Sequence, residues 1–246
     1  MKIKNKNNKP LVSGDNIITK NSQWKFSGNT AKNFDKHISK SVPLYEWSHD
    51  IALKTSDFFL TEKGQAYDLG CSTGTFLNKV SKRNNNLKKI KFIGIDEIND
   101  MCKLAKKNNI KNKNVRIINK NITKLKFEKS ALITSFYTVQ FIHPSKRQEL
   151  FNKIYKTLNW GGAFIFFEKV RAPDARFQDL VTQIYQDYKI DQGYSAEEII
   201  SKSRSLKGVM EPFSSKGNTD LLKRAGFKDV TTIMKFLCFE GWLAIK

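Results

Sequence analysis

The stretch that most constrains the fold of this chain is residues 66–74, with the sequence AYDLGCSTG. It reads as a short apolar strand followed by a glycine turn, and Phe76 then begins a helix. Gly70 and Gly74 have no Cβ, so the backbone there can adopt positive φ and let a ligand approach closely. The first N–H groups of the helix would point into the crevice at the strand end. This arrangement is typical of a nucleotide-binding site in an open α/β sheet.

A single acidic residue ends the next predicted strand, 91–96. Asp96 lies roughly 20 residues beyond the glycine turn, a spacing at which a carboxylate can accept both hydroxyls of a ribose. A turn that is packed tightly for its own sake would also use glycine, but it would not need this acid. Asp68, which stands before the first glycine, separates the pattern from the G-x-G-x-x-G dinucleotide form.

Strands and helices alternate along the rest of the chain. After Asp96 the predicted strands are 115–118, 131–137 and 163–168, and the predicted helices are 101–105, 144–158 and 221–227. Ser145 and Gln148 have the spacing of a capping box at the start of the second of these helices. Residues 231–236 and 239–245 read as a closing hairpin. The alternation predicts an α/β fold with a mostly parallel sheet.

The composition divides the chain into a tail and one domain. Residues 1–20 are expected to be a disordered basic tail. Residues 21–246 are expected to form a single domain with an N-terminal helical cap, 21–60, over the crevice and a helical insertion, 171–215. The aromatic segment that starts at Trp24 is expected to dock on a neighbouring surface.

The three cysteines are widely spaced and indicate neither a zinc site nor a disulfide framework. No apolar run approaches the roughly 20 residues of a membrane span, and no apolar signal core follows the basic start. We therefore expect a cytoplasmic protein with no metal site and no membrane association.

The net charge of +21 has two interpretations. It could form an electrostatic surface for nucleic acid, or it could reflect a bias towards lysine and asparagine on solvated faces. The basic runs lie between predicted elements and have no interleaved aromatic residues, which favours the second interpretation.

Further motifs resemble the carboxy-S-adenosylmethionine synthase family. In chain order they are SVPLY at 41–45, DLGCS at 68–72, TVQF at 138–141, KRQEL at 146–150, KIY at 153–155, GG at 161–162, EK at 168–169, QGYS at 192–195 and KRAGF at 223–227. The resemblance runs from about Trp24 to the end of the chain.

The resemblance implies a Rossmann-like class I methyltransferase fold. In that fold a mostly parallel seven-stranded sheet has helices on both faces and ends in an antiparallel hairpin. Members of the family are typically homodimers. They use S-adenosylmethionine and prephenate to make carboxy-S-adenosylmethionine, which a partner enzyme uses to modify the wobble uridine of tRNA.

The glycine turn, the acid and the resemblance together indicate which residues bind the cofactor. The expected set is Tyr45, Asp68, Gly70, Cys71, Ser72, Gly74, Asp96, Glu97, Asn121, Ile122, Phe136 and Arg204.

Three positions depart from the family pattern. Phe136 replaces an asparagine, Ser203 replaces the arginine that pairs with the carboxylate of carboxy-S-adenosylmethionine, and Asn121 replaces an aspartate. An asparagine oxygen can still accept a hydrogen bond, but a buried carboxylate without a cation is costly. Arg204 follows directly, although neighbours on a helix point about 100° apart. Phe136 could attract a methyl sulfonium through its ring or simply fill the core.

These departures favour a methyltransferase that uses S-adenosylmethionine on a small-molecule acceptor and binds the carboxylated cofactor poorly. The first alternative is carboxy-S-adenosylmethionine synthase, with Arg204 holding the carboxylate. The second is a non-catalytic protein that binds tRNA or a partner enzyme through its basic surface.

No nucleophilic triad is visible, and methyl transfer needs none. A general base could come from His37, His49 or Tyr45, although a lone histidine is more often a surface or capping residue. Glu168 ends the fifth predicted strand and could orient an acceptor, or it could form a salt bridge with a neighbouring basic residue.

Overall fold

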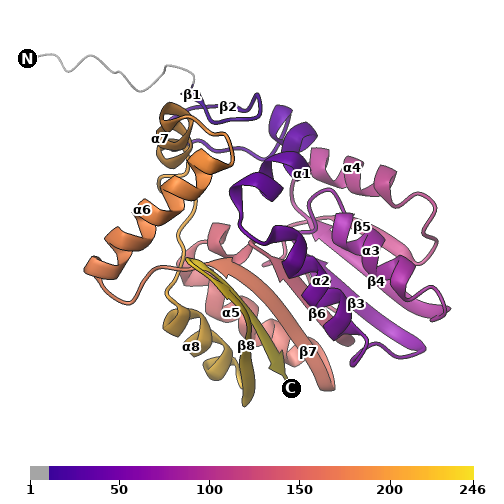
Figure 1. Cartoon of the computed structure of the whole chain (residues 1–246). Helices are drawn as coiled ribbons and strands as arrows, with labels where there is room; N and C mark the ends of the chain where they lie inside the picture. The colour runs from indigo at the N-terminus through magenta and orange to yellow at the C-terminus, as the bar shows by residue number, and fades with distance from the viewer. Residues whose placement is uncertain (1–10) are drawn as a thin grey trace, which may run out of the picture.

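A seven-stranded sheet forms the centre of the computed structural model, which describes residues 11–246 (Figure 1). Its strands are β3 (Lys63–Leu69), β4 (Lys89–Asp96), β5 (Val115–Asn119), β6 (Ser130–Phe136), β7 (Leu158–Lys169), β8 (Asp229–Phe236) and β9 (Phe239–Ile245). Their order across the sheet is β5-β4-β3-β6-β7-β9-β8.

Strands β5 to β7 of this order run parallel, and β9 pairs antiparallel with both β7 and β8. The chain first builds outward from β3 to β4 and β5, and then returns to place β6 on the other side of β3. The carboxyl ends of β3 and β6 therefore border the crevice where open α/β sheets bind ligands. The predicted mostly parallel sheet with a C-terminal antiparallel hairpin is confirmed.

Helices cover both faces of the sheet. They are α1 (Asn29–Ser41), α2 (Tyr45–Ser56), α3 (Thr75–Arg83), α4 (Asn99–Asn108), α5 (Pro144–Thr157), α6 (Ala175–Asp191), α7 (Ala196–Ser205) and α8 (Ser215–Ala225). In β7, Ile165 and Phe167 pack with residues of α2 and α3, whereas Phe164 and Phe166 pack with residues of α5 and α8. This alternation follows from the two-residue period of a strand.

Helices α6 and α7 make up most of the predicted insertion and stand beside the sheet rather than over it (Figure 1). No described helix is long and apolar enough to cross a membrane.

Residues 11–20 differ from the expected disordered tail. They form a hairpin of β1 (Leu11–Val12) and β2 (Ile18–Thr19), which lies beside α7 (Figure 1). Asp15 and Asn16 both have positive φ in its turn, as a two-residue hairpin loop requires. Ile17 is fully buried. The rest of the expected tail, 1–10, lies outside the described residues.

The capping-box prediction for α5 is also wrong. The N-cap is His143, whose ring nitrogen accepts a hydrogen bond from the Ser145 backbone N–H. Pro144 occupies the first turn, where its missing N–H is tolerated. Ser145 therefore lies one residue too far along the chain to cap the helix.

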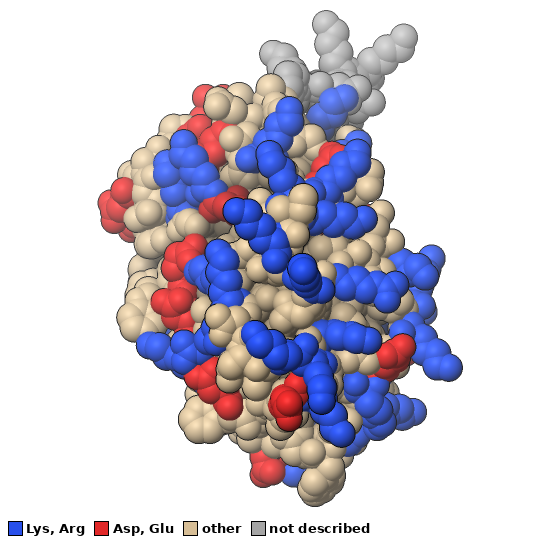
Figure 2. Space-filling view, turned by 90° about the vertical axis from the view of Figure 1, so that its right-hand side faces the viewer, with Lys and Arg blue, Asp and Glu red and all other residues tan. Residues whose placement is uncertain are grey.

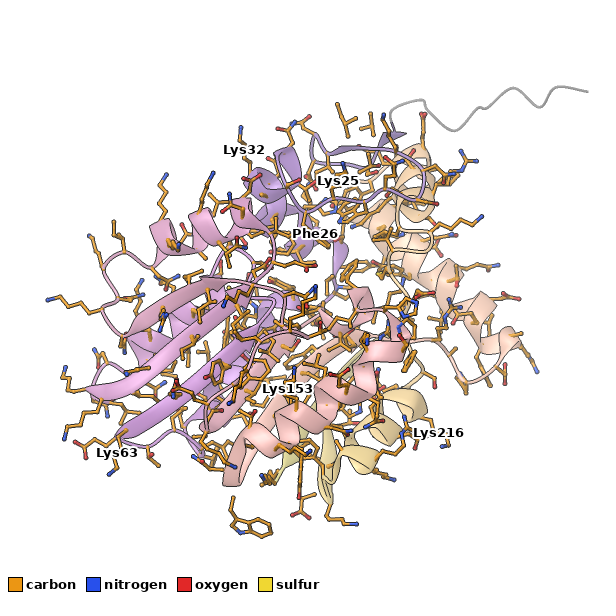
Figure 3. All side chains as sticks on the ribbon, turned by 180° about the vertical axis from the view of Figure 1, so that it is seen from behind. Lys25, Phe26, Lys32, Lys63, Lys153 and Lys216 are labelled. Atoms are coloured by element: carbon orange, nitrogen blue, oxygen red, sulfur yellow. The ribbon has the colours of Figure 1, made fainter. Side chains whose placement is uncertain are left out.

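The aromatic segment at Trp24 docks within its own chain. The Trp24 ring lies 5.7 Å from the His37 ring, and Phe26 packs edge-on against Phe141 at 4.9 Å. Figure 3 shows Phe26 between α1 and the sheet. These contacts place the segment on the wall of the crevice.

Candidate functional site

A cavity of about 940 Å³ opens at the carboxyl ends of β3, β4, β6 and β7. The sheet ends form its floor, and α1, α6 and α7 form its walls. Ten of the expected site residues line it: His37, Tyr45, Gly70, Ser72, Asp96, Glu97, Asn121, Ile122, Phe136 and Arg204. Four others, Asp68, Cys71, Gly74 and Glu168, do not.

The glycine turn is held by the backbone of β4. Gly70 and Cys71 donate their N–H groups to the carbonyl of Ile95 at 2.8 and 3.0 Å. Gly70, Ser72 and Gly74 all have positive φ. A Cβ at Gly70 would lie 2.3 Å from Thr138 Oγ1. The glycine is therefore required by the close approach of the segment after β6, besides any ligand.

Asp96 fixes the turn and the start of α4. Its Oδ2 accepts from the Ser72 N–H at 3.0 Å and its Oδ1 accepts from the Ile98 N–H at 2.8 Å. The residue is buried and lines the cavity. Burial raises the pKa of this carboxyl, although the two N–H donors lower it. Each oxygen keeps a further lone pair for hydroxyl groups of a ligand.

Asn121 is already engaged on both ends of its amide. The nitrogen donates to Glu97 Oε2 at 2.6 Å, and the oxygen accepts from the backbone and hydroxyl of Thr123 at 2.9 and 2.6 Å. Any hydrogen bond from a base amino group to this oxygen would therefore compete with Thr123.

Asp68 and Cys71 lie beneath the turn. The Asp68 carboxylate accepts from Thr134 Oγ1 at 2.9 Å. Burial raises its pKa to about 7, which the nearby Asp96 reinforces and the Thr134 hydrogen bond opposes. Cys71 is buried in the core. Both residues support the turn from below instead of facing the cavity.

Phe136 belongs to an aromatic cluster at the end of β6. Its ring stacks on Phe167 at 5.3 Å and contacts His49 at 4.5 Å and Phe76 at 4.7 Å. It is also half-buried and lines the cavity. The ring thus fills the core and forms part of the cavity wall. Burial lowers the pKa of His49 to about 3, so this imidazole is neutral.

Glu168 has a structural partner on each oxygen. Val139 and Gln140, in the short 3-10 helix η2 (Val139–Phe141), donate their backbone N–H groups to it at 2.8 Å each. Burial raises its pKa to about 8, although the two N–H groups oppose this. It forms no ion pair with Lys169 or Arg171.

Three cavity-lining cations had no place in the sequence-based site: Lys169, Lys189 and Lys202. They come from β7, α6 and α7. Ser203 and Arg204 line the same region. Nothing in the chain sequence distinguishes these lysines from the many others, because only the folded arrangement brings them together.

The donor set fits S-adenosylmethionine at the β3–β4 end of the cavity. Asp96 offers carboxylate oxygens for a ribose, and Gly70 and Ser72 line the same end. The cavity volume is at the upper end of the usual range of roughly 300–1,000 Å³ for ligand pockets, which leaves room for a second small molecule. No cluster of three potential metal ligands occurs in residues 11–246.

Comparisons with known proteins agree with this geometry. A family model described as a methyltransferase domain matches residues 66–162. The chain is 40% identical over 228 residues to a carboxy-S-adenosyl-L-methionine synthase from Staphylococcus epidermidis, covering 91% of this chain and 97% of that protein. It is 33% identical over 225 residues to the protein of the same name from Campylobacter lari, covering 91% and 95%.

Solved structures share the fold at low sequence identity. Human N-acetylserotonin methyltransferase in complex with S-adenosylmethionine aligns with a TM-score of 0.59 and 17% identity, over 89% of this chain and 55% of that one. An O-methyltransferase family protein from Burkholderia thailandensis aligns with a TM-score of 0.60 and 12% identity, over 89% and 60%.

Proposed function

The chain belongs to the carboxy-S-adenosyl-L-methionine synthase family, and on that premise we propose that it converts S-adenosylmethionine to carboxy-S-adenosylmethionine. The cofactor would lie against the cavity-lining residues Tyr45, Gly70, Ser72, Asp96 and Phe136. The sulfonium group supplies an activated methyl carbon. The protein holds the nucleoside, excludes water and provides cations for an anionic reaction partner.

One observation carries this proposal. The cavity has a carboxylate, Asp96, at the end expected to hold a ribose, and three lysines on another part of its wall. The loss of the family's arginine at Ser203 therefore does not leave the cavity without cations. The main objection to a carboxylated product, an uncompensated charge, is removed.

Plain methyl transfer is the second candidate. Phe136 favours it, because an aromatic ring on the cavity wall can stabilise a methyl sulfonium and offers no hydrogen bond to a carboxylate. His37 and Tyr45 line the cavity and stay candidate proton-transfer groups for either reaction. The acceptor of such a methyl group would be a small molecule.

The wider roles are also proposals. The resemblance supports a homodimer and a place in tRNA wobble-uridine modification in the cytoplasm. Figure 2 shows Lys and Arg side chains spread widely over one face of the molecule, with fewer Asp and Glu among them. This spread fits solvated faces at least as well as a defined nucleic-acid site.

The product identifies the function. The purified protein is incubated with S-adenosylmethionine labelled in its methyl group, with and without prephenate, and the nucleosides are identified by mass spectrometry. We expect labelled carboxy-S-adenosylmethionine only when prephenate is present.

The other outcomes contradict the proposal in separate ways. Loss of the label to an added small molecule, with S-adenosylhomocysteine formed, would establish methyl transfer instead. Recovery of unchanged S-adenosylmethionine under all conditions would favour a non-catalytic binding protein.

A further inference from the structure

Three lysine side chains from three elements converge on one part of the cavity wall. Lys169 ends β7, Lys189 lies near the end of α6, and Lys202 lies on α7. The ammonium groups of Lys169 and Lys189 lie 4.3 and 4.5 Å from the ring centroid of Tyr185. Lys189 is only 9% exposed. The cluster therefore belongs to the cavity and is not part of the solvated outer surface.

No acidic side chain neutralises the cluster directly. Among residues 11–246, no Asp or Glu oxygen lies within 4 Å of any of the three ammonium groups. Residues 1–10 contain no Asp or Glu. Buried cations without counter-ions are costly. An arrangement of this kind is explained if an anionic ligand completes it.

A chain of hydrogen bonds holds Lys202 in place. His37 Nδ1 lies 2.9 Å from Asp15 Oδ2, and His37 Nε2 lies 2.6 Å from Lys202 Nζ. Burial, reinforced by Lys202, lowers the pKa of His37 to about 4, so the ring is neutral. Because a carboxylate only accepts, Nδ1 carries the proton and Nε2 accepts from Lys202. The ammonium keeps its other two N–H groups for a ligand.

Asp15 is itself fixed by other contacts. Its Oδ2 also accepts from the Tyr194 hydroxyl at 2.8 Å. Lys36 and Lys40 lie 3.9 and 3.8 Å from its Oδ1. These two lysines satisfy the charge of Asp15 on the side away from the cavity. The N-terminal hairpin therefore orients Lys202 through His37 without forming an ion pair with it.

We propose that Lys169, Lys189 and Lys202 bind the second substrate of this enzyme as a small organic anion with at least two carboxylates. This inference rests on the proposed function, in which the nucleoside occupies the Asp96 end. Tyr185 places an apolar ring between two of the cations, which suits carboxylates separated by a carbon framework better than a compact inorganic anion. His37 and Asp15 act as positioning residues.

The anion affinity depends on pH through the lysines. Burial lowers the pKa of all three, to about 7 for Lys202 and about 8 for Lys189, and neighbouring lysines lower these two further. Their charge is complete below these values and is lost as the pH rises through them. The affinity should therefore fall between pH 6.5 and 9.

Other charged or titratable groups face the cluster from every adjoining element: His37, Asp15, Arg171, Tyr185 and Cys238. His37 stays neutral above its low pKa. Burial raises the pKa of the Cys238 thiol and of the Tyr185 hydroxyl. The lysines are therefore the groups that change charge in this pH range.

The test is calorimetric titration of the full chain with benzylmalonate, an aromatic dicarboxylate, and with its uncharged dimethyl ester. S-adenosylhomocysteine is titrated in parallel. We expect benzylmalonate to bind and the ester not to bind. Lys189→Gln and Lys202→Gln should each weaken benzylmalonate binding at least about tenfold, as loss of one partner of a desolvated charge does.

The matched control is Lys216→Gln. Lys216 lies on α8 with its side chain 83% exposed (Figure 3). This variant should bind benzylmalonate within about twofold of the unmodified protein, since exposed ion pairs contribute little. All three variants should bind S-adenosylhomocysteine about as tightly as the unmodified protein.

The positioning role of Asp15 has its own readout. Asp15→Asn removes a negative charge that raises the pKa of Lys202. The pH at which half of the benzylmalonate affinity is lost should therefore move lower. A purely structural loss would weaken binding equally at every pH.

The outcomes separate the two proposals. Benzylmalonate binding that is absent, independent of pH or unchanged in both lysine variants overturns the lysine site and leaves the transferase proposal standing. Failure of S-adenosylhomocysteine and S-adenosylmethionine to bind overturns the transferase proposal, even if benzylmalonate binds.

Discussion

Asp96 uses one carboxylate for two tasks at the scale of single residues. It holds the Ser72 and Ile98 N–H groups, and it presents its remaining lone pairs to the cavity. The first task shapes the turn, and the second would bind a ribose. A substitution that keeps the shape of the side chain but removes its charge separates the two tasks.

We expect Asp96→Asn to weaken S-adenosylmethionine binding by about 1–3 kcal/mol, the scale for a charged hydrogen bond. Calorimetry on the folded variant measures this change. Asp229→Asn, at the exposed start of β8, is the control and should bind normally. Unchanged affinity in Asp96→Asn would remove the ribose role from this residue.

The sequence predicted one end of the site and missed the other. Gly70, Ser72 and Asp96 were accessible because a strand, a turn and a strand end are read directly from local order. Lys189 and Lys202 were not, because they lie on separate helices and the chain has 44 Lys and Arg residues. Glu168 was placed correctly at a strand end, but its contacts with η2 depend on packing that no local pattern indicates.

Helix α6 has two different faces at the scale of elements. Tyr185 and Lys189 line the cavity, whereas Phe177, Leu180 and Ile184 lie about half-exposed on the other side. The three apolar residues are spaced three and four positions apart, which places them on one stripe. A second copy of the chain is the occupant that the family resemblance indicates.

We expect the protein to be a homodimer and Leu180→Asp to make it monomeric, because the buried stripe would have to accept an unpaired charge. Light scattering over a wide concentration range measures the mass. Ile110→Asp is the control, since Ile110 is 81% exposed and follows α4, far from α6 (Figure 1). A monomer mass for the unmodified protein would contradict the expectation.

Elements with a clear period were predicted, and those held by distant contacts were not. The strands of the sheet and the closing hairpin follow from apolar runs and glycine turns. The β1–β2 hairpin has two residues per strand, too few to show a period. Asp15 in its turn is held instead by His37 and Tyr194, which lie 22 and 179 positions away in the chain.

The whole molecule combines a family fold with changed residues at the reacting end. Phe136 and Ser203, taken alone, predict a preference for S-adenosylmethionine over its carboxylated form. The folded cavity adds Lys169, Lys189 and Lys202 to that comparison. Charges interact strongly in a water-poor cavity, so we expect the three cations to outweigh the two substitutions.

Competitive binding of the two cofactors to the unmodified protein tests this claim most directly. Carboxy-S-adenosylmethionine and S-adenosylmethionine are titrated against each other at pH 6.5 and low salt. The account predicts that the carboxylated cofactor binds at least about tenfold more tightly, which corresponds to roughly 1.4 kcal/mol. Equal binding, or tighter binding of S-adenosylmethionine, would contradict it and support methyl transfer.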